Sequence, residues 1–294
     1  MERRSQLHCP RAGAVRLGCA LLIALLAPGA RGDEAAPGDP IERGNAAFEA
    51  RFEIATMHEA IAAYEAALAD LESHPPEIQT LVLNRLAQLH YELTTFSPGN
   101  TAEDAAAFRA GKEYGLRSLR LNPEFAALEE EDFDAAVAVV VDPAALLWTA
   151  DNWGALFQID PISGFLHLGK VRALYERCLA VDETYWGASA HNALGAMLIV
   201  TPAALGGNED AGLVHLERAL SLDATYLENR VVYAQYWGFT YDLFGRVSGV
   251  RDAKFLGEEL HSVLAAPIGD WPFWNREAKR EADRLLAELE ERVP

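Results

Sequence analysis

The chain has 294 residues, of which 50% are hydrophobic and 9% aromatic, and its formal net charge is -19. This length and hydrophobicity allow a large buried core, and the few aromatic residues favour closely packed helices. The acidic balance argues against nucleic acid and anionic membrane surfaces as partners.

The first 32 residues have the pattern of a secretory signal peptide. Four arginines precede an apolar run at 17–27, and Ala30 and Gly32 are small residues spaced for cleavage. The run has 11 residues, fewer than the roughly 20 of a membrane anchor, which is the alternative. Cys19 precedes most of the run, so a lipid anchor is not expected. We predict a signal peptide at 1–32, a linker at 33–40 and a helical domain at 41–294.

Downstream, apolar residues recur at three- and four-residue steps, and proline and glycine fall between the periodic segments. Thr101 and Asp104 have the spacing of a capping box at a helix start. The predicted fold class is therefore all-α, with about twelve helices. They span residues 41–52, 57–71, 78–93, 102–121, 135–141, 144–158, 164–181, 185–200, 209–222, 226–244, 253–264 and 273–291.

Residues 135–141 are ambiguous. Their sequence, AAVAVVV, has the β-branched content of a strand. The short length, the following Asp142-Pro143 and the helical neighbours favour a short buried helix. Both interpretations remain open from the sequence.

An internal repeat is the strongest indication of architecture. Residues 175–185 read YERCLAVDETY, and residues 216–226 read LERALSLDATY, 41 positions later. Weaker copies lie at 115–125 and 64–71. Self-similarity at this period predicts stacked helix pairs, as in a tetratricopeptide-like α-solenoid.

The repeat also accounts for the cysteines. Cys9 and Cys19 lie in the predicted signal peptide, which leaves Cys178 alone and excludes an intramolecular disulfide. Cys178 aligns with Ala219, so we interpret it as a small buried spacer at a helix crossing.

Motifs for catalysis, cofactors or metals are weak. Residues 164–170 match G-x-x-x-x-G-K, but Val171 lacks the hydroxyl that would hold magnesium. His167, His191 and His215 lie in different predicted helices, so we expect scattered histidines rather than a metal site. We therefore predict no catalytic residue, cofactor or metal. A helical hydrolase, the alternative, would need carboxylates and histidines that converge in a cleft.

The clusters of aromatic residues on the predicted helices have two possible roles. Core packing is one, and lining of a cavity or concave groove is the other. The candidate ligand-binding residues are Trp148, Trp153 and Phe157 on one predicted helix, and Tyr233, Trp237 and Tyr241, four residues apart, on another. Gly206 and Gly207 are assigned to a tight turn.

Several features together resemble the T component of tetratricopeptide-repeat-associated TRAP transporters. They are LAVDETYWG, His191, Leu194-Gly195, Pro202, Gly206-Gly207, LERALSLD and Val232-Tyr233-Ala234, within residues 153–286. Residues 41–134 match the pattern more loosely.

The resemblance implies a periplasmic, non-enzymatic accessory protein that docks the extracytoplasmic solute-binding subunit of a TRAP transporter. It also implies a homo-oligomer, such as a trimer, with an apolar channel or pocket for a small hydrophobic or organic-acid ligand. The alternative is a secreted helical-repeat scaffold for envelope protein assembly, with a filled core and no small ligand.

Overall fold

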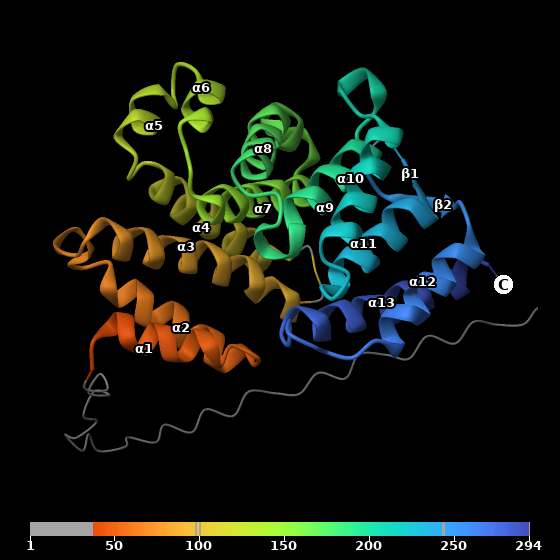
Figure 1. The fold of residues 1–294 in the computed structure, drawn as a ribbon, viewed down its shortest axis with the longest axis horizontal. Helices are drawn as coiled ribbons and strands as arrows, with labels where there is room; N and C mark the ends of the chain where they lie inside the picture. The colour runs from red at the N-terminus through yellow and green to blue at the C-terminus, as the bar shows by residue number, and fades with distance from the viewer. Residues whose placement is uncertain (1–37, 98, 100, 243–244, 294) are drawn as a thin grey trace, which may run out of the picture. The chain divides into compact units, whose positions relative to one another are not determined.

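Helices form nearly all of the regular structure in the residues that the computed structural model describes, which are 38–97, 99, 101–242 and 245–293 (Figure 1). The predicted signal peptide and most of the predicted linker lie outside these residues. The all-α prediction is confirmed. The described elements are α1 (Pro40–Glu49), α2 (Ile54–Ala67), η1 (Leu71–Ser73), α3 (Pro76–Leu93), η2 (Thr94–Phe96), α4 (Ala102–Leu119), α5 (Pro123–Leu128), α6 (Phe133–Ala138), α7 (Pro143–Ile159), α8 (Pro161–Val181), α9 (Tyr185–Val200), η3 (Ala203–Leu205), α10 (Glu209–Leu222), α11 (Leu227–Gly238), β1 (Phe239–Tyr241), β2 (Val247–Val250), α12 (Ala253–Ala265) and α13 (Trp274–Arg292).

Local sequence explains where many of these helices begin. The predicted capping box is present, because Thr101 Oγ1 accepts from Asp104 N at 3.0 Å and Asp104 Oδ2 accepts from Thr101 N at 2.9 Å. Other helices begin after a side chain that accepts from the first free backbone N–H groups. These N-caps are Asp39, Asn122, Asp132, Asp142, Asn208 and Asp252.

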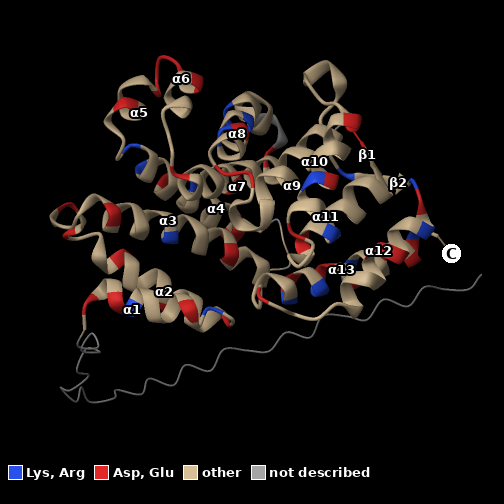
Figure 2. Ribbon diagram, viewed as in Figure 1, with Lys and Arg blue, Asp and Glu red and all other residues tan. Residues whose placement is uncertain are grey.

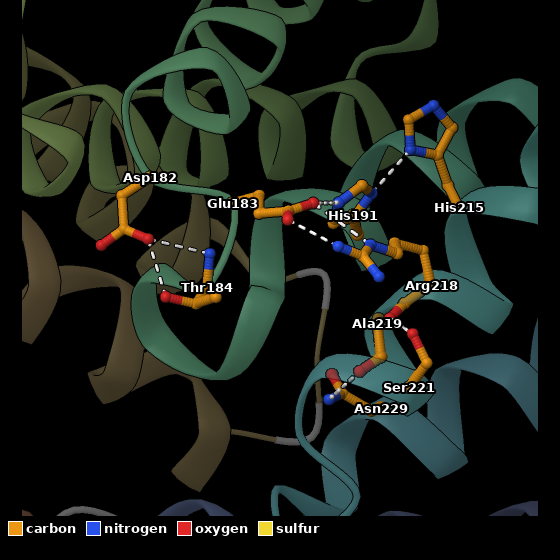
Figure 3. Close-up of polar contacts among 9 residues, drawn as sticks. All are labelled: Asp182, Glu183, Thr184, His191, His215, Arg218, Ala219, Ser221 and Asn229. Atoms are coloured by element: carbon orange, nitrogen blue, oxygen red, sulfur yellow. Dashed lines mark hydrogen bonds and ion pairs between the residues drawn. The ribbon is translucent and has the colours of Figure 1, made fainter.

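The sequence repeat is built as a repeated turn. Asp182 Oδ1 accepts from Thr184 N at 2.9 Å and from Thr184 Oγ1 at 2.7 Å (Figure 3). Asp223 Oδ1 accepts from the same atoms of Thr225 at 2.8 and 2.6 Å. In both copies this aspartate closes the turn between two helices.

Several predicted helix boundaries are wrong, and in two places the error changes the order of the elements. The helix expected at 102–121 ends at Leu119, and Asn122 and Pro123 start the additional helix α5. The helix expected at 226–244 ends at Gly238, and the chain enters the antiparallel hairpin of β1 and β2. A Cβ at Gly238 would lie 2.9 Å from Leu256 Cβ. The helix thus ends at a close approach to α12, before the strand-favouring sequence Phe-Thr-Tyr.

Residues 135–141 are helical at first and then irregular. Helix α6 covers Phe133–Ala138, and Val139 to Val141 follow outside any helix or strand. The helical interpretation is correct for the first part of the segment.

Neighbouring helices pack in pairs in the described part of the chain. The pairs are α1 with α2, α3 with α4, α7 with α8, α9 with α10, and α11 with α12. Helix α4 also packs on α7, while α13 packs on both α11 and α12. These pairs are the units of the predicted solenoid, whose superhelical arrangement stays a prediction.

Charged residues are interspersed along α13 (Figure 2). Successive ion pairs follow the helix, including Glu281 with Arg284 at 2.6 Å and Glu288 with Arg292 at 2.9 Å. The opposite side of α13 is apolar and packs on α11 and α12. Among the described residues, no helix combines the length and apolar character needed to cross a bilayer.

Candidate functional site

Six aromatic side chains contact one another in a closed series, which we call the aromatic circuit. Each ring centroid lies 4.7–6.4 Å from the next. Such separations are typical of direct aromatic packing. In order around the circuit, the members are Tyr91 from α3, Trp148 from α7, Trp186 from α9, Trp271 from the α12–α13 connection, Tyr226 before α11, and Trp274 from α13.

An unusual backbone turn positions Trp186. Three consecutive residues are left-handed, with φ of 51° at Trp186, 64° at Gly187 and 66° at Ala188. This region is unfavourable for tryptophan and alanine, so the surrounding structure must hold it. The turn places the Trp186 ring 5.2 Å from that of Trp148 and 5.6 Å from that of Trp271.

Asn229 holds this turn in place. Its fully buried side chain donates from Nδ2 to Gly187 O at 2.9 Å and to Asp223 O at 2.7 Å. Asn192 Nδ2 in turn donates to Asn229 Oδ1 at 2.6 Å. The amide network therefore ties the left-handed turn to the second copy of the sequence repeat.

The same repeat holds Trp271. Its Nε1 donates to Asp223 Oδ2 at 3.1 Å. Nearby, fully buried Asn275 accepts from Leu227 N at 2.8 Å and donates to Thr225 O at 2.8 Å. The beginnings of α11 and α13 are thus fixed to each other at the circuit.

Two circuit members carry unused hydrogen-bond donors. Nε1 of Trp186 and Nε1 of Trp274 are buried and have no partner among the described residues. A buried N–H without an acceptor is costly, and native proteins rarely leave one except where a water or ligand supplies the acceptor.

Two carboxyl groups act electrostatically on Tyr91 and Tyr226 of the circuit. Burial raises the pKa of Asp151 to about 7, although the hydrogen bond from Tyr175 Oη at 2.8 Å acts to lower it. Burial, and then the charge of Glu281, raises the pKa of Glu228 to about 7. After burial, these two carboxylates have the largest effects in raising the pKa of Tyr91.

The predicted ligand-binding residues lie in separate places. Trp148 belongs to the circuit, whereas Trp153 packs 6.0 Å from Phe133 and 5.2 Å from His167. Phe157 is partly buried on α7, beside Gly164. The structure therefore does not bring these three residues of one helix to a common site.

The second predicted group is also divided. Tyr233 packs edge-on against Phe255 at 5.2 Å, and Trp237 lies beneath Arg251 at 4.4 Å. Tyr241 lies on β1, where its Oη donates to Gln235 O at 3.0 Å. The expected helical stripe is wrong because the helix ends before Tyr241.

Gly206 and Gly207 follow η3. Gly206 has a φ of 94°, a left-handed value that suits glycine. A Cβ at Gly207 would collide with Thr201 O. Both residues therefore occupy backbone positions that only glycine fits without strain.

The histidines are not all scattered as predicted. His191 Nδ1 lies 2.8 Å from His215 Nδ1, and His191 Nε2 lies 3.4 Å from Glu183 Oε2 (Figure 3). Glu183 also pairs with Arg218 at 2.6 Å. His167 lies elsewhere, against Trp153. Within the described part of the chain, no group of three or more histidine, cysteine or acidic side chains is placed to hold a metal.

Comparison with known proteins gives one family match. Residues 101–292 match the family model described as "TRAP transporter T-component". The matched segment contains all members of the aromatic circuit except Tyr91. A search of curated proteins gave no match.

Proposed function

The chain belongs to the TRAP transporter T-component family, and from this premise we propose that it is a non-enzymatic periplasmic accessory protein. In this role it docks the extracytoplasmic solute-binding subunit of the transporter. The predicted signal peptide supports export, and the net charge of -19 supports a protein partner over nucleic acid. We further propose a homo-oligomer, with a trimer as the expected form.

The aromatic circuit is the proposed site for a small apolar or amphipathic organic ligand. The closed series of six ring contacts, with two unpaired indole donors, is the observation that carries this proposal. Binding sites of this kind combine aromatic walls with a few polar groups.

Accessibility around the circuit supports an internal space. Asp151, Glu228 and Tyr91 are only partly buried, yet burial is the largest influence on the pKa of each. These side chains are surrounded by protein but retain accessible surface. Such a combination is expected of residues that line an interior space open to solvent.

The burial of the circuit members gives a physical route for ligand to pass from the solute-binding subunit to this chain. Tyr91, Trp186 and Trp271 are half-buried members of the circuit, whereas Trp148 and Tyr226 are almost fully buried. A docked solute-binding subunit would pass its ligand to the half-buried side, and the buried rings would form the closed end.

Copurification tests the partner. We would coexpress the full chain with any TRAP solute-binding subunit encoded near its gene and analyse the purified material by native mass spectrometry. A stoichiometric complex is expected, and the same spectra would give the oligomeric state. Absence of any complex would contradict the docking role.

Tryptophan fluorescence tests the ligand. Four of the six tryptophans belong to the circuit, so binding there should change the emission. We would screen short-chain carboxylates, alcohols and amines against the wild type, Trp186→Leu and the matched control Trp237→Phe. A response in the wild type and the control, lost in Trp186→Leu, is expected. No response to any compound would favour the filled-core scaffold.

A further inference from the structure

We propose that a cleft between the end of α2, η1, α3 and the end of α4 binds a small zwitterion. Such a ligand carries an ammonium group, a carboxylate and an apolar side chain, as free apolar amino acids and short peptides with unblocked ends do. None of the residues that line the cleft belongs to the aromatic circuit. This binding site is therefore additional to the one proposed above.

The cleft has the size and the apolar surface of a small-molecule site. Its volume is about 650 Å³, within the range of about 300–1,000 Å³ that is typical of ligand pockets. Leu71 and Leu83 line it and are buried, at 5% and 1% exposed, and Leu121 adds a side chain that is 38% exposed. An apolar side chain of the ligand would bury its surface against these leucines.

The charged residues that line the cleft are separated by sign. Asp70 and Glu72 come from the segment around η1. Arg117 and Arg120 come from the end of α4, where a spacing of three residues places them on one helix face. No ion pair joins the two acids to the two arginines in the residues that the structure describes. Opposite charges thus line one space without neutralising each other.

Arg117 is the cation that remains available to a ligand. Arg120 is already paired, because its Nε lies 2.6 Å from Glu129 Oε1. Arg117 forms no ion pair within the described part of the chain, and its guanidinium carbon lies 5.8 Å from the centroid of the Tyr114 ring. A planar guanidinium can donate two parallel hydrogen bonds to a carboxylate. We therefore assign the carboxylate of the ligand to Arg117.

The segment around η1 and the start of α3 supply acceptors for an ammonium group. Glu72 has no cationic partner among the described residues, and Asp70 has the His74 ring at 3.7 Å. Gln79 lines the same cleft and donates from Nε2 to His74 O at 2.8 Å, which leaves its Oε1 to accept. An ammonium group has three N–H donors, so Glu72 and Gln79 can both bind it.

A comparison with another cleft shows why the unpaired charges matter. This other cleft has a volume of about 460 Å³ and lies between α6 and α8. Its arginines are already engaged, because Arg172 pairs with Glu176 at 2.7 Å and Arg177 donates to Val140 O at 2.7 Å. The cleft at η1 is the one that leaves a charge of each sign to a ligand.

Four probes test the two charges separately. Leucyl-leucine has both charged ends, its N-acetyl derivative lacks the ammonium group, and its C-terminal amide lacks the carboxylate. Free leucine has both charges on a smaller molecule. Calorimetry with the full chain at low ionic strength, where exposed charges are least screened, would measure binding. We expect leucyl-leucine to bind about tenfold more tightly than either blocked derivative.

The comparison of leucine with leucyl-leucine identifies the source of the zwitterion. Tighter binding of leucine would assign the site to free amino acids, and tighter binding of leucyl-leucine would assign it to short peptides. Both results support the proposal, provided that the blocked derivatives bind more weakly.

Two charge variants connect each end of the ligand to one residue. Arg117→Gln should weaken leucyl-leucine and its N-acetyl derivative about tenfold and leave the amide unchanged. Glu72→Gln should weaken leucyl-leucine and the amide about tenfold and leave the N-acetyl derivative unchanged. Arg109→Gln is the matched control, because Arg109 is exposed on α4 and does not line the cleft. It should change the binding of none of the probes.

A third variant fills the cleft without removing a charge. Ala69 is exposed and lines the cleft, so Ala69→Trp should abolish binding of all four probes. The denaturation midpoint of each variant would establish that it is folded.

Three results would overturn the proposal. One is equal binding of leucyl-leucine and its blocked derivatives. Another is binding that persists in both Arg117→Gln and Ala69→Trp, and if that binding is lost in Trp186→Leu, the ligand belongs to the aromatic circuit. The last is no binding of any probe, which would leave the docking role to be decided separately by copurification.

Discussion

Arg51 and Glu92 form a buried ion pair in which Arg51 Nε lies 2.6 Å from Glu92 Oε2. Glu92 is fully buried and also accepts from Gln88 Nε2 at 2.7 Å. The guanidinium carbon of Arg51 lies 3.7 Å from the centroid of the Phe48 ring and 5.6 Å from that of Phe273. This ion pair thus joins the first helix pair to α3 and to the segment before α13.

Glu92→Gln should destabilise the protein by about 3–5 kcal/mol, because it leaves the buried charge of Arg51 without its partner. Urea denaturation at neutral pH would measure the loss. Glu258→Gln, which removes an exposed ion pair with Lys254, is the control and should cost less than about 0.5 kcal/mol. Similar losses in the two variants would show that the Arg51–Glu92 pair has no special structural role.

Gly187→Ala should destabilise the protein by about 1–3 kcal/mol. The residue has a φ of 64°, and an added Cβ would meet the ring of Tyr226. Gly169→Ala on α8 is the matched control, because its Cβ would meet no atom within 4 Å. It should stabilise the helix by about 0.5–1 kcal/mol. Thermal denaturation compares the two, and a stabilising Gly187→Ala would contradict the strained turn.

The His191–His215 contact should make stability fall in mild acid. Burial lowers the pKa of both side chains, and for His215 the charge of His191 lowers it further. The folded state therefore favours neutral imidazoles, so this stability is complete above the unfolded pKa of about 6.5 and is lost as pH falls below it. Glu183 and Arg218 face His191, while Glu176 and Arg172 act on His215.

The His215→Gln variant isolates the contribution of the histidine pair to acid stability, because the glutamine side chain does not titrate. Urea midpoints measured from pH 8 to pH 5 should fall less in the variant than in the wild type. Parallel curves would show that the histidine pair does not control acid stability.

Asp151→Asn should stabilise the ligand-free protein at pH 8 by about 2–4 kcal/mol. The pKa of Asp151 is raised from an ordinary 3.8 to about 7, so the folded state favours the protonated carboxyl. The wild type therefore loses stability as the pH rises from about 4 to about 7, and asparagine does not ionise. Asparagine can still accept from Tyr175 Oη. The gain should vanish near pH 4, and exposed Asp283→Asn is the control. A gain that is independent of pH would contradict the raised pKa.

Features of the fold that depend on neighbouring residues were predictable from the sequence, whereas features that depend on contacts between distant residues were not. The capping box of Thr101 and Asp104 and the repeated turns at Asp182 and Asp223 depend on neighbouring residues, so the sequence indicates them directly. Asn122-Pro123 is a helix-start signal for α5 that the repeat comparison obscured. The end of α11 at Gly238 depends instead on contact with Leu256, which periodicity does not reveal.

The candidate site shows the same division. The recurrence of aromatic residues on its helix makes Trp148 a candidate from the sequence, and Tyr226 is the last residue of the second repeat copy. Trp186 could not be placed, because tryptophan rarely adopts a left-handed backbone and local propensity predicts an ordinary helix start. Tyr91 and Trp274 meet only through packing of α3 near α13, which no short sequence pattern indicates.

The aromatic circuit also has a consequence for how the molecule is made. Its contacts join Tyr91 to Trp274, far apart along the chain, whereas each helix pair forms between neighbours. Distant contacts form more slowly than local ones. During biogenesis the aromatic circuit would close last, after the helical hairpins, and the proposed ligand would stabilise only chains in which the circuit has closed.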